Sequence, residues 1–524
     1  MMKKKNNENE NAIAREKEME AADDSLLKEY GKAFHEILAE KHIIDSTITM
    51  LQWELETITP PGGQALLSKQ MGYYSMKSYD LLTSEKMQKI LACFKKNRDV
   101  LSPVLKREAE LLTEDMERLR LIPPGEYKAY KEFLTESQPL WQKAKAAGDF
   151  SMFRDALKKI FDTSKRFARY EYEAKDEAYR KEKTLYDVNL EQYEKGMDVA
   201  RLDEFFGALK EEVVPLLRQV LKRQGGKKAK NPNLTVDAQK KLCRYLSAYL
   251  GFDFERGTMA ESEHPFTTHF DKNDVRFTTR YMKNPSTFSL LSTLHETGHA
   301  IYEQQIDDKY TGTILGNGSS NGLHEAQSRF YENVVGRSEA FWKGLQGREE
   351  LEPLFSKTSL GSFCFAINKV EPSLIRIEAD ELTYPLHIMI RYEIEKGIFN
   401  DTIKVKDLPE VWNEKMREYL GITPPNDGAG VLQDVHWADG LIGYFPSYAI
   451  GSAYAAQIYA SLRKDLPFEK ILEQGDLAPI REWLSAKIHR YGSFKDSRDI
   501  MKKATGEELN PKYYIEYLKE RFLK

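Results

Sequence analysis

The sequence is poor in cysteine, with only Cys93, Cys243 and Cys364 in 524 residues. An odd number of widely spaced cysteines builds neither a disulfide framework nor a zinc knuckle. Sparse cysteine of this kind is typical of a reducing compartment. We therefore expect a cytoplasmic protein.

An excess of charge of one sign and a long apolar run are also missing. The formal net charge is −4, so no basic footprint points to nucleic acid, and we expect no such partner. The most apolar stretch, residues 444–462, contains Pro446, Gln457 and several serines. That composition favours a buried helix over a membrane span, so we expect no membrane partner.

The chain begins with a charged segment followed by a long helical region. Residues 1–24 begin with a run of three lysines after two methionines and continue mainly with Asn, Glu and Ala, without the apolar core of a secretory signal. We expect a disordered charged tail there, and one large helical domain over residues 25–524. From Ser25 to about Leu221 apolar residues recur at helical spacing. Proline and glycine interrupt this pattern at residues 60–63 and 123–125.

Between His264 and Tyr281 the apolar spacing changes from the helical to the alternating kind. Two runs alternate apolar or β-branched residues with polar ones, and a polar turn at residues 271–274 separates them. This pattern predicts a small antiparallel hairpin. Such a ribbon offers a peptide an edge strand to pair with, or it simply covers the core.

Residues 295–299 read His-Glu-Thr-Gly-His within an apolar, helix-compatible run that we expect to begin at Asn284-Pro285. Residues four apart share one face of a helix, so His295 and His299 can bind one metal ion. Glu296 is then placed to act as general base on a water beside the metal. The alternative is a chance match. Gly298 costs about 1 kcal/mol inside a helix relative to alanine. The close approach of another element would explain why glycine stands at this position.

A catalytic zinc ion needs a third protein ligand. One zinc-peptidase pattern supplies a histidine after a glycine, but Tyr302 and Gln305 stand at those two positions and exclude it. The other arrangement takes a glutamate from a following helix. We choose Glu325, which follows a glycine- and serine-rich turn, and keep Glu303 and Glu332 as alternatives.

These motifs, taken together, resemble the carboxypeptidase Taq family of zinc metallocarboxypeptidases. The likeness extends over nearly the whole chain after the tail and includes residues 53–63, 193–197 and 443–448. One departure is Ala326, where the family usually has serine. The six ordered blocks are His264-Pro265-Phe266, Asp274-Val275-Arg276-Phe277-Thr278, the 295–299 motif, His324-Glu325-Ala326-Gln327, Ile375-Arg376-Ile377-Glu378-Ala379-Asp380, and Gly430-Val431-Leu432-Gln433-Asp434-Val435-His436-Trp437.

The resemblance implies a mainly α fold: a single large helical catalytic domain with a deep groove and a small antiparallel β-sheet near the metal. It implies an N-terminal part, about 25–230, that covers the cleft, and a metal-site part, about 231–524. It further implies a homodimer that removes single residues from peptide C-termini with broad specificity. One Zn²⁺ per chain would be held by His295, His299 and Glu325, and Co²⁺ suits the same ligands.

Further site residues follow from the family blocks. A planar guanidinium suits the free carboxylate of a peptide, which makes Arg376 the candidate; the alternative is an ion pair with Asp380 one helical turn away. We expect His436 and Tyr444 to donate to the oxyanion or the substrate backbone, although both also suit a packed core. Three hairpin residues are candidates to line the cleft: His264, His269 and Arg276.

Two other functions compete with the carboxypeptidase hypothesis. A helical zinc oligopeptidase or endopeptidase would use the same ligands and differ only in the bond that it cuts. An inactive helical interaction scaffold is a reading of a different class. The intact histidine pair together with Glu296 argues against the scaffold.

Overall fold

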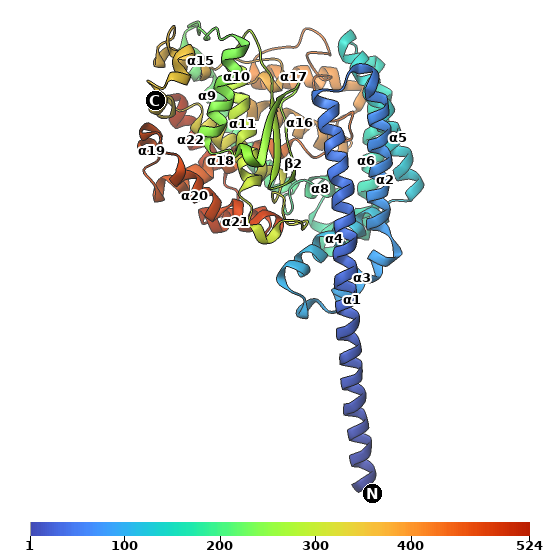
Figure 1. Ribbon diagram of the computed structural model, residues 1–524. Helices are drawn as coiled ribbons and strands as arrows, with labels where there is room; N and C mark the ends of the chain where they lie inside the picture. Colours follow the sequence, from blue (N-terminus) through green and yellow to red (C-terminus); the bar gives the residue numbers. More distant parts are fainter. Residues whose placement is uncertain (1, 524) are drawn as a thin grey trace. The chain divides into compact units, whose positions relative to one another are not determined.

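A computed structural model describes the backbone of residues 2–523 and the side chains of residues 25–523. The disordered tail expected over residues 1–24 lies outside the residues whose side chains are described, and it stays a prediction. The described chain is mainly helical with one small sheet, which confirms the expected fold class (Figure 1).

The chain forms two compact units, each with its own hydrophobic core. The first comprises Met1–Leu119 and Tyr310–Leu315, and the second comprises Arg120–Lys309 and Gly316–Lys524. The sequence analysis also expects a division near residue 230, between a part that covers the cleft and a part that holds the metal site. That division does not refer to compact units, and it stays a prediction.

The first unit is built from four helices. The expected break at residues 60–63 is confirmed, because the first helix ends before Pro60 and the next begins after Gly63. The apolar residues at helical spacing, such as Phe34 and Leu38, are buried in the core of this unit. The helices are α1 (Met2–Thr57), α2 (Gln64–Thr83), α3 (Glu85–Lys96) and α4 (Pro103–Leu121), whose last residues already belong to the second unit.

The second unit holds the other helices. The most apolar stretch of the sequence is buried within one of them, as expected, and no described helix has the length and apolarity that a membrane span requires. The helices are α5 (Pro124–Ala147), α6 (Arg154–Ala174), α7 (Glu177–Glu182), α8 (Leu185–Glu191), α9 (Val199–Gln224), α10 (Val236–Leu250), α11 (Thr287–Gln304), α12 (Asn321–Arg329), α13 (Glu339–Leu345), α14 (Glu352–Phe355), α15 (Leu360–Ile367), α16 (Tyr384–Phe399), α17 (Leu408–Leu420), α18 (Pro446–Asp465), α19 (Phe468–Gln474), α20 (Ala478–Lys487), α21 (Ser497–Thr505) and α22 (Pro511–Leu523).

The sheet contains β1 (Gly257–Glu261), β2 (Thr267–Asp271) and β3 (Asp274–Thr279) in the order β1-β3-β2. The predicted hairpin is confirmed, because β2 and β3 pair antiparallel. The sheet is mixed, however, and not purely antiparallel, since β1 pairs parallel to β3. The sequence of β1, Gly-Thr-Met-Ala-Glu, is poor in the β-branched and aromatic residues that indicate a strand. Both strands of the hairpin pack against α11, which Figure 1 shows beside the sheet.

The helix that carries the two histidines begins later than the sequence predicts. It starts at Thr287, not at Asn284-Pro285. Ser286 occupies the N-cap position, but its side chain accepts no hydrogen bond from the helix. The Ser286 hydroxyl donates instead to the carbonyl of Pro232, so a tertiary contact takes the place of a local side-chain cap.

Helix α12 lies in close contact with two other helices at glycines. A Cβ atom at Gly298 of α11 would lie 2.6 Å from the carbonyl oxygen of Gln327 and 2.8 Å from the Cα of Ser328. A Cβ atom at Gly451 of α18 would lie 2.5 Å from the Cγ of Glu325. The expected close approach at Gly298 is therefore confirmed, and the element that makes it is the one that carries Glu325.

Replacing Gly298 with alanine should destabilise the protein by about 1–3 kcal/mol, because the added methyl group meets backbone atoms that cannot rotate away. The matched control is Gly207→Ala in α9, where no atom lies within 4 Å of the added Cβ. That control should stabilise the protein by up to about 1 kcal/mol. Urea denaturation of both variants measures the difference, and equal stabilities would contradict the close packing of α11 on α12.

Candidate metal centre and active site

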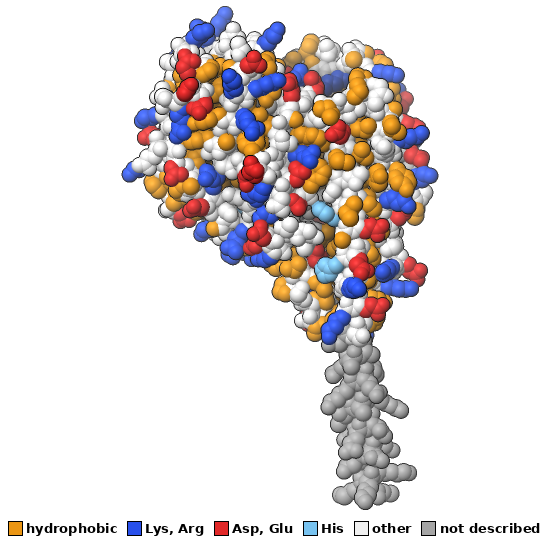
Figure 2. All heavy atoms as spheres, in the orientation of Figure 1, with side chains coloured by type: hydrophobic (Ala, Val, Ile, Leu, Met, Phe, Trp, Pro, Cys, Tyr) orange, Lys and Arg blue, Asp and Glu red, His pale blue; other side chains and the backbone are white. Residues whose placement is uncertain are grey.

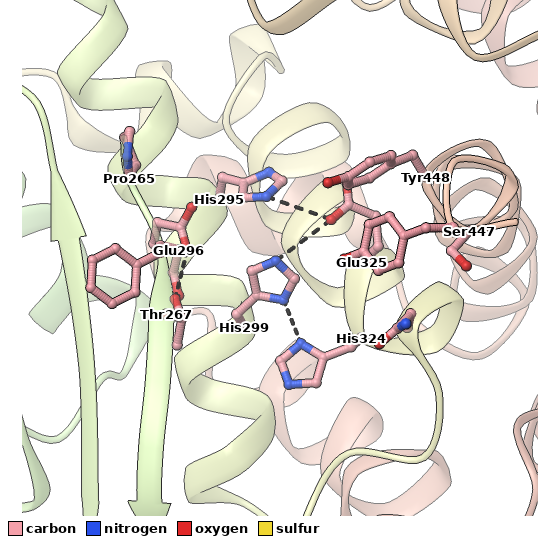
Figure 3. Close-up of a pocket in the computed structure, with 12 residues that line it drawn as sticks. Pro265, Thr267, His295, Glu296, His299, His324, Glu325, Ser447 and Tyr448 are labelled. Carbon is pink, nitrogen blue, oxygen red and sulfur yellow. Dashed lines mark hydrogen bonds and ion pairs between the residues drawn. The ribbon is translucent and has the colours of Figure 1, made fainter. Parts of the chain in front are cut away.

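Two imidazoles from α11 and one carboxylate from α12 converge in a cavity (Figure 3). The Nε2 atoms of His295 and His299 lie 3.7 and 3.6 Å from Oε2 of Glu325. One ligand atom from each residue lies within 4.8 Å of the others. Two imidazoles and a carboxylate are a donor set of catalytic zinc sites, so the three residues fit this metal.

Glu325 is held so that one oxygen faces the histidines. Its Oε1 accepts a hydrogen bond of 2.7 Å from Nε of Arg329, which leaves Oε2 toward the two imidazoles. Burial raises the pKa of Glu325, but the Arg329 guanidinium and His295 lower it well below its usual range. The carboxylate is therefore ionised, as a metal ligand must be.

The other ring nitrogen of each histidine is also bound. His295 Nδ1 lies 2.9 Å from Oε2 of Glu332, and His299 Nδ1 lies 2.5 Å from Nδ1 of His324. The Nε2 of His324 in turn lies 2.7 Å from Oε1 of Glu303. Glu303 and Glu332, the alternative third ligands, thus support the two histidines from behind, and Glu325 is the carboxylate that faces both Nε2 atoms.

Glu296 lines the same cavity, on the side of the sheet. Oγ1 of Thr267, on β2, donates a hydrogen bond of 2.6 Å to its Oε2, and Figure 3 shows this bond. Burial raises the pKa of Glu296 above the usual glutamate value, and His295 and the Thr267 hydroxyl offset part of that rise. A carboxylate with a raised pKa is a better proton acceptor, which suits a general base.

The cavity has a volume of about 280 Å³. Of the two predicted oxyanion donors, Tyr444 lines it, whereas His436 lies behind Tyr448, with Nε2 3.1 Å from the Tyr448 hydroxyl. Burial and the Arg376 guanidinium lower the pKa of His436 to about 3, so this imidazole is neutral. The lining residues are Pro265, Phe266, Thr267, His295, Glu296, His299, Asn321, His324, Glu325, Tyr444, Ser447 and Tyr448.

Arg376 lies next to this cavity but is only 5% exposed. Its Nε and one terminal nitrogen donate to Oδ1 of Asp434 over 3.0 and 2.9 Å, and the guanidinium lies 4.9 Å from the ring centre of Tyr448. The alternative, an ion pair with Asp380 on one helix, is wrong. Residues 376–378 form a short 3₁₀ turn, and Asp380 instead accepts the N–H groups of Leu382 and Thr383.

The three hairpin residues expected at the cleft do not line this cavity. His264 is exposed, Nε2 of His269 lies 2.7 Å from Oδ1 of Asn317, and Arg276 pairs with Asp274. None of the three is among the residues that line the cavity, to which the hairpin contributes residues 265–267. Their role in substrate binding stays a prediction.

Sequence reasoning missed three residues that line the cavity: Thr267, His324 and Tyr448. Thr267 lies on the face of β2 opposite to Thr268, and alternation alone does not reveal which face meets α11. His324 precedes the proposed glutamate ligand, and the only sequence signal for it was its place in a family block. Tyr448, also missed as a site residue, was visible only as one aromatic in a family block.

Comparison with known proteins agrees with this geometry. Residues 33–522 match the profile of the carboxypeptidase Taq (M32) metallopeptidase family. The chain belongs to this family. The carboxypeptidase 1 of Bacillus subtilis is 41% identical over 500 residues, which cover 94% of this chain and 98% of that protein.

Two further relatives come from other branches of life. The thermostable carboxypeptidase 1 of Pyrococcus furiosus is 36% identical over 483 residues, covering 91% of this chain and 95% of the relative. The solved structure of Trypanosoma cruzi metallocarboxypeptidase 1 is 32% identical and superimposes with a TM-score of 0.89, covering 95% of this chain and all of that one. The protein is therefore a metallocarboxypeptidase.

Replacing Thr267 with valine should move the acid limb of the kcat/KM profile to higher pH. The Thr267 hydroxyl lowers the pKa of Glu296, so its loss raises that pKa and activity falls earlier as the pH decreases. The control is Thr268→Val, whose side chain points to the opposite face of β2. The measurement is the initial rate of peptide hydrolysis over an assay range of about pH 4 to about pH 8. Identical acid limbs for the two variants would contradict the prediction.

Proposed function

We propose that the protein is a zinc-dependent carboxypeptidase that releases single C-terminal residues from peptides with broad specificity. The observation that carries the proposal is the convergence of His295, His299 and the ionised Glu325 beside a second carboxylate, Glu296, which is not one of the three proposed ligands. The preference for zinc rests on the ligand types, and the breadth of specificity rests on the family resemblance.

His295, His299 and Glu325 would hold the zinc ion. When bound, zinc acts as a Lewis acid that polarises the scissile carbonyl and lowers the pKa of water. Glu296 takes the proton of the attacking water and then passes it to the leaving amine. The Thr267 hydroxyl fixes the Glu296 carboxylate for both transfers.

The oxyanion side of the cavity is aromatic. Tyr444 and Tyr448 line it, and the neutral His436 imidazole holds the Tyr448 hydroxyl. We assign Tyr444 as the donor to the developing oxyanion or the substrate backbone. His436 acts behind Tyr448 in this proposal.

A charge imbalance behind Tyr448 supports recognition of a free carboxylate. Asp434 lies between Arg376 and Arg391, at 2.9 and 2.5 Å, and both guanidiniums are buried. Their other donors bind neutral groups: the Tyr384 hydroxyl, the side-chain carbonyl of Gln433 and the backbone carbonyl of His387. Two buried cations against one anion leave a positive charge that the C-terminal carboxylate of a peptide would neutralise.

The same proposal includes a homodimer, a cytoplasmic location and activity with Co²⁺. The dimer comes from the family resemblance, and the location comes from the sparse cysteines. Cobalt binds the same combination of imidazole and carboxylate ligands.

Glu296→Gln should bind zinc as the wild type does and lose about 10²–10⁴-fold in kcat, because the amide cannot accept the proton. Removing metal with a chelator should abolish wild-type activity, and adding back Zn²⁺ or Co²⁺ should restore it. Elemental analysis and rates on a C-terminally free peptide measure both effects. Near-normal turnover by the variant would refute the role of Glu296, and full activity without metal would refute the zinc proposal.

Arg376→Ala should lower kcat/KM by at least about 10-fold for peptides with a free C-terminus, because a charge-assisted pair with the substrate is lost. Cleavage of the same peptides as C-terminal amides should change little. The ratio of the two rates is the measurement, and it is independent of a general loss of folded protein. An equal loss on both substrates would refute the carboxylate role and favour an oligopeptidase.

A further inference from the structure

The two histidine ligands are supported by different chemical groups. His295 Nδ1 binds a carboxylate directly, at 2.9 Å from Glu332. His299 Nδ1 binds another imidazole, at 2.5 Å from Nδ1 of His324, and Figure 3 shows the two rings facing each other. His324 is not a metal ligand in the site described above, yet it contacts one directly.

The positions of the protons follow from this chain of contacts. His299 binds a metal through Nε2 only if its proton sits on Nδ1. Nδ1 of His324 must then accept that hydrogen bond, so the proton of His324 sits on Nε2. That N–H group points to Oε1 of Glu303, at 2.7 Å. The Glu303 carboxylate can only accept hydrogen bonds. One arrangement of protons therefore satisfies the whole relay, which consists of His299, His324 and Glu303.

The far end of the relay is fixed. Glu303 is 1% exposed and lies on α11, one helical turn after His299. Its Oε1 also accepts the backbone N–H of Gly318 over 3.1 Å. A Cβ atom at Gly318 would lie 2.5 Å from Cδ2 of His324, so the loop backbone confines the ring. The relay starts and ends on α11 and passes through α12.

We propose that His324 is a positioning residue that holds His299 in the tautomer and ring orientation required for metal binding. It thereby sets the affinity of the site for its metal. The inference rests on the proposed zinc site and adds a role for a residue that neither binds the metal nor touches the reacting atoms. Support of this kind changes metal affinity by about 10–100-fold in other metal sites.

Three replacements of His324 separate its two hydrogen bonds. Alanine removes both. The Oδ1 atom of asparagine takes the position of Nδ1 and keeps the acceptor for His299, and the Nε2 atom of glutamine takes the position of the ring Nε2 and keeps the donor to Glu303. We expect His324→Ala and His324→Gln to weaken zinc binding by about 10–100-fold, and His324→Asn to stay within about 5-fold of the wild type.

The measurement is competition for Zn²⁺ between the metal-free full-length protein and a chromogenic chelator, with thermal unfolding followed in parallel. The control is His489→Ala, which removes a fully buried imidazole whose ring nitrogens lie 2.7 and 2.9 Å from the amide oxygens of Gln305 and Gln327. The control should lose stability and keep its zinc affinity within about 5-fold, because His489 contacts no proposed ligand.

Each outcome decides one point. Wild-type affinity in His324→Ala would overturn the proposal. Equal losses in the alanine, glutamine and asparagine variants would also overturn it, since a packing role ignores which nitrogen is replaced. Failure of the wild-type protein to bind zinc would instead refute the proposed zinc site. Losses in the alanine and glutamine variants with near-normal binding by asparagine would support the relay.

Discussion

The close contact between α11 and α12 at Gly298 is the constraint on which the site depends. The spacing of the two histidines places them on one face of α11, but the third ligand must come from another helix. A bare Cα at Gly298 lets the α12 backbone approach to a distance that any side chain would prevent. Gly451 does the same for α18, which closely approaches the aliphatic part of the Glu325 side chain. The metal site is therefore set by backbone packing, which is less adaptable than side-chain rotamers.

The charges around the cavity have opposite signs at its two ends. Near the histidines, Arg329 binds both Glu325 and Glu332, at 2.7 and 3.0 Å, and Glu296 adds a further carboxylate. Behind Tyr448, by contrast, the two guanidiniums of Arg376 and Arg391 share Asp434. An acidic end suits a divalent cation, and a basic end suits an anion. Under the proposed function, this polarity would orient a peptide with its scissile carbonyl at the metal and its free carboxylate toward the arginines. On the face drawn in Figure 2, by comparison, cationic and anionic side chains of the described residues are interspersed.

Features that depend on local periodicity could be predicted from the sequence, whereas features set by packing could not. The α11 motif, the break at residues 60–63 and the β2–β3 hairpin all follow from spacing within a few residues. The start of α11 does not follow from spacing, because Ser286 binds the distant Pro232 instead of capping its own helix. The pairing of β1 with β3 depends on a crossover that no local pattern encodes. Arg376 shows the same limit, since its partner Asp434 lies in another part of the chain and the nearby Asp380 binds backbone N–H groups.

The unequal support of the two histidines has a reason in electrostatics. A carboxylate directly behind His299 as well would add a fourth buried carboxylate to Glu325, Glu332 and Glu296, and burying like charges together is costly. The His324 ring carries the hydrogen bond to His299 and keeps Glu303 one ring further from the proposed metal. Glu303 then lies between His324 and His269, whose imidazoles lower its pKa to about 2, although burial alone would raise it. The relay thus transmits the orienting effect of a carboxylate to His299 without placing that charge beside the metal ligands.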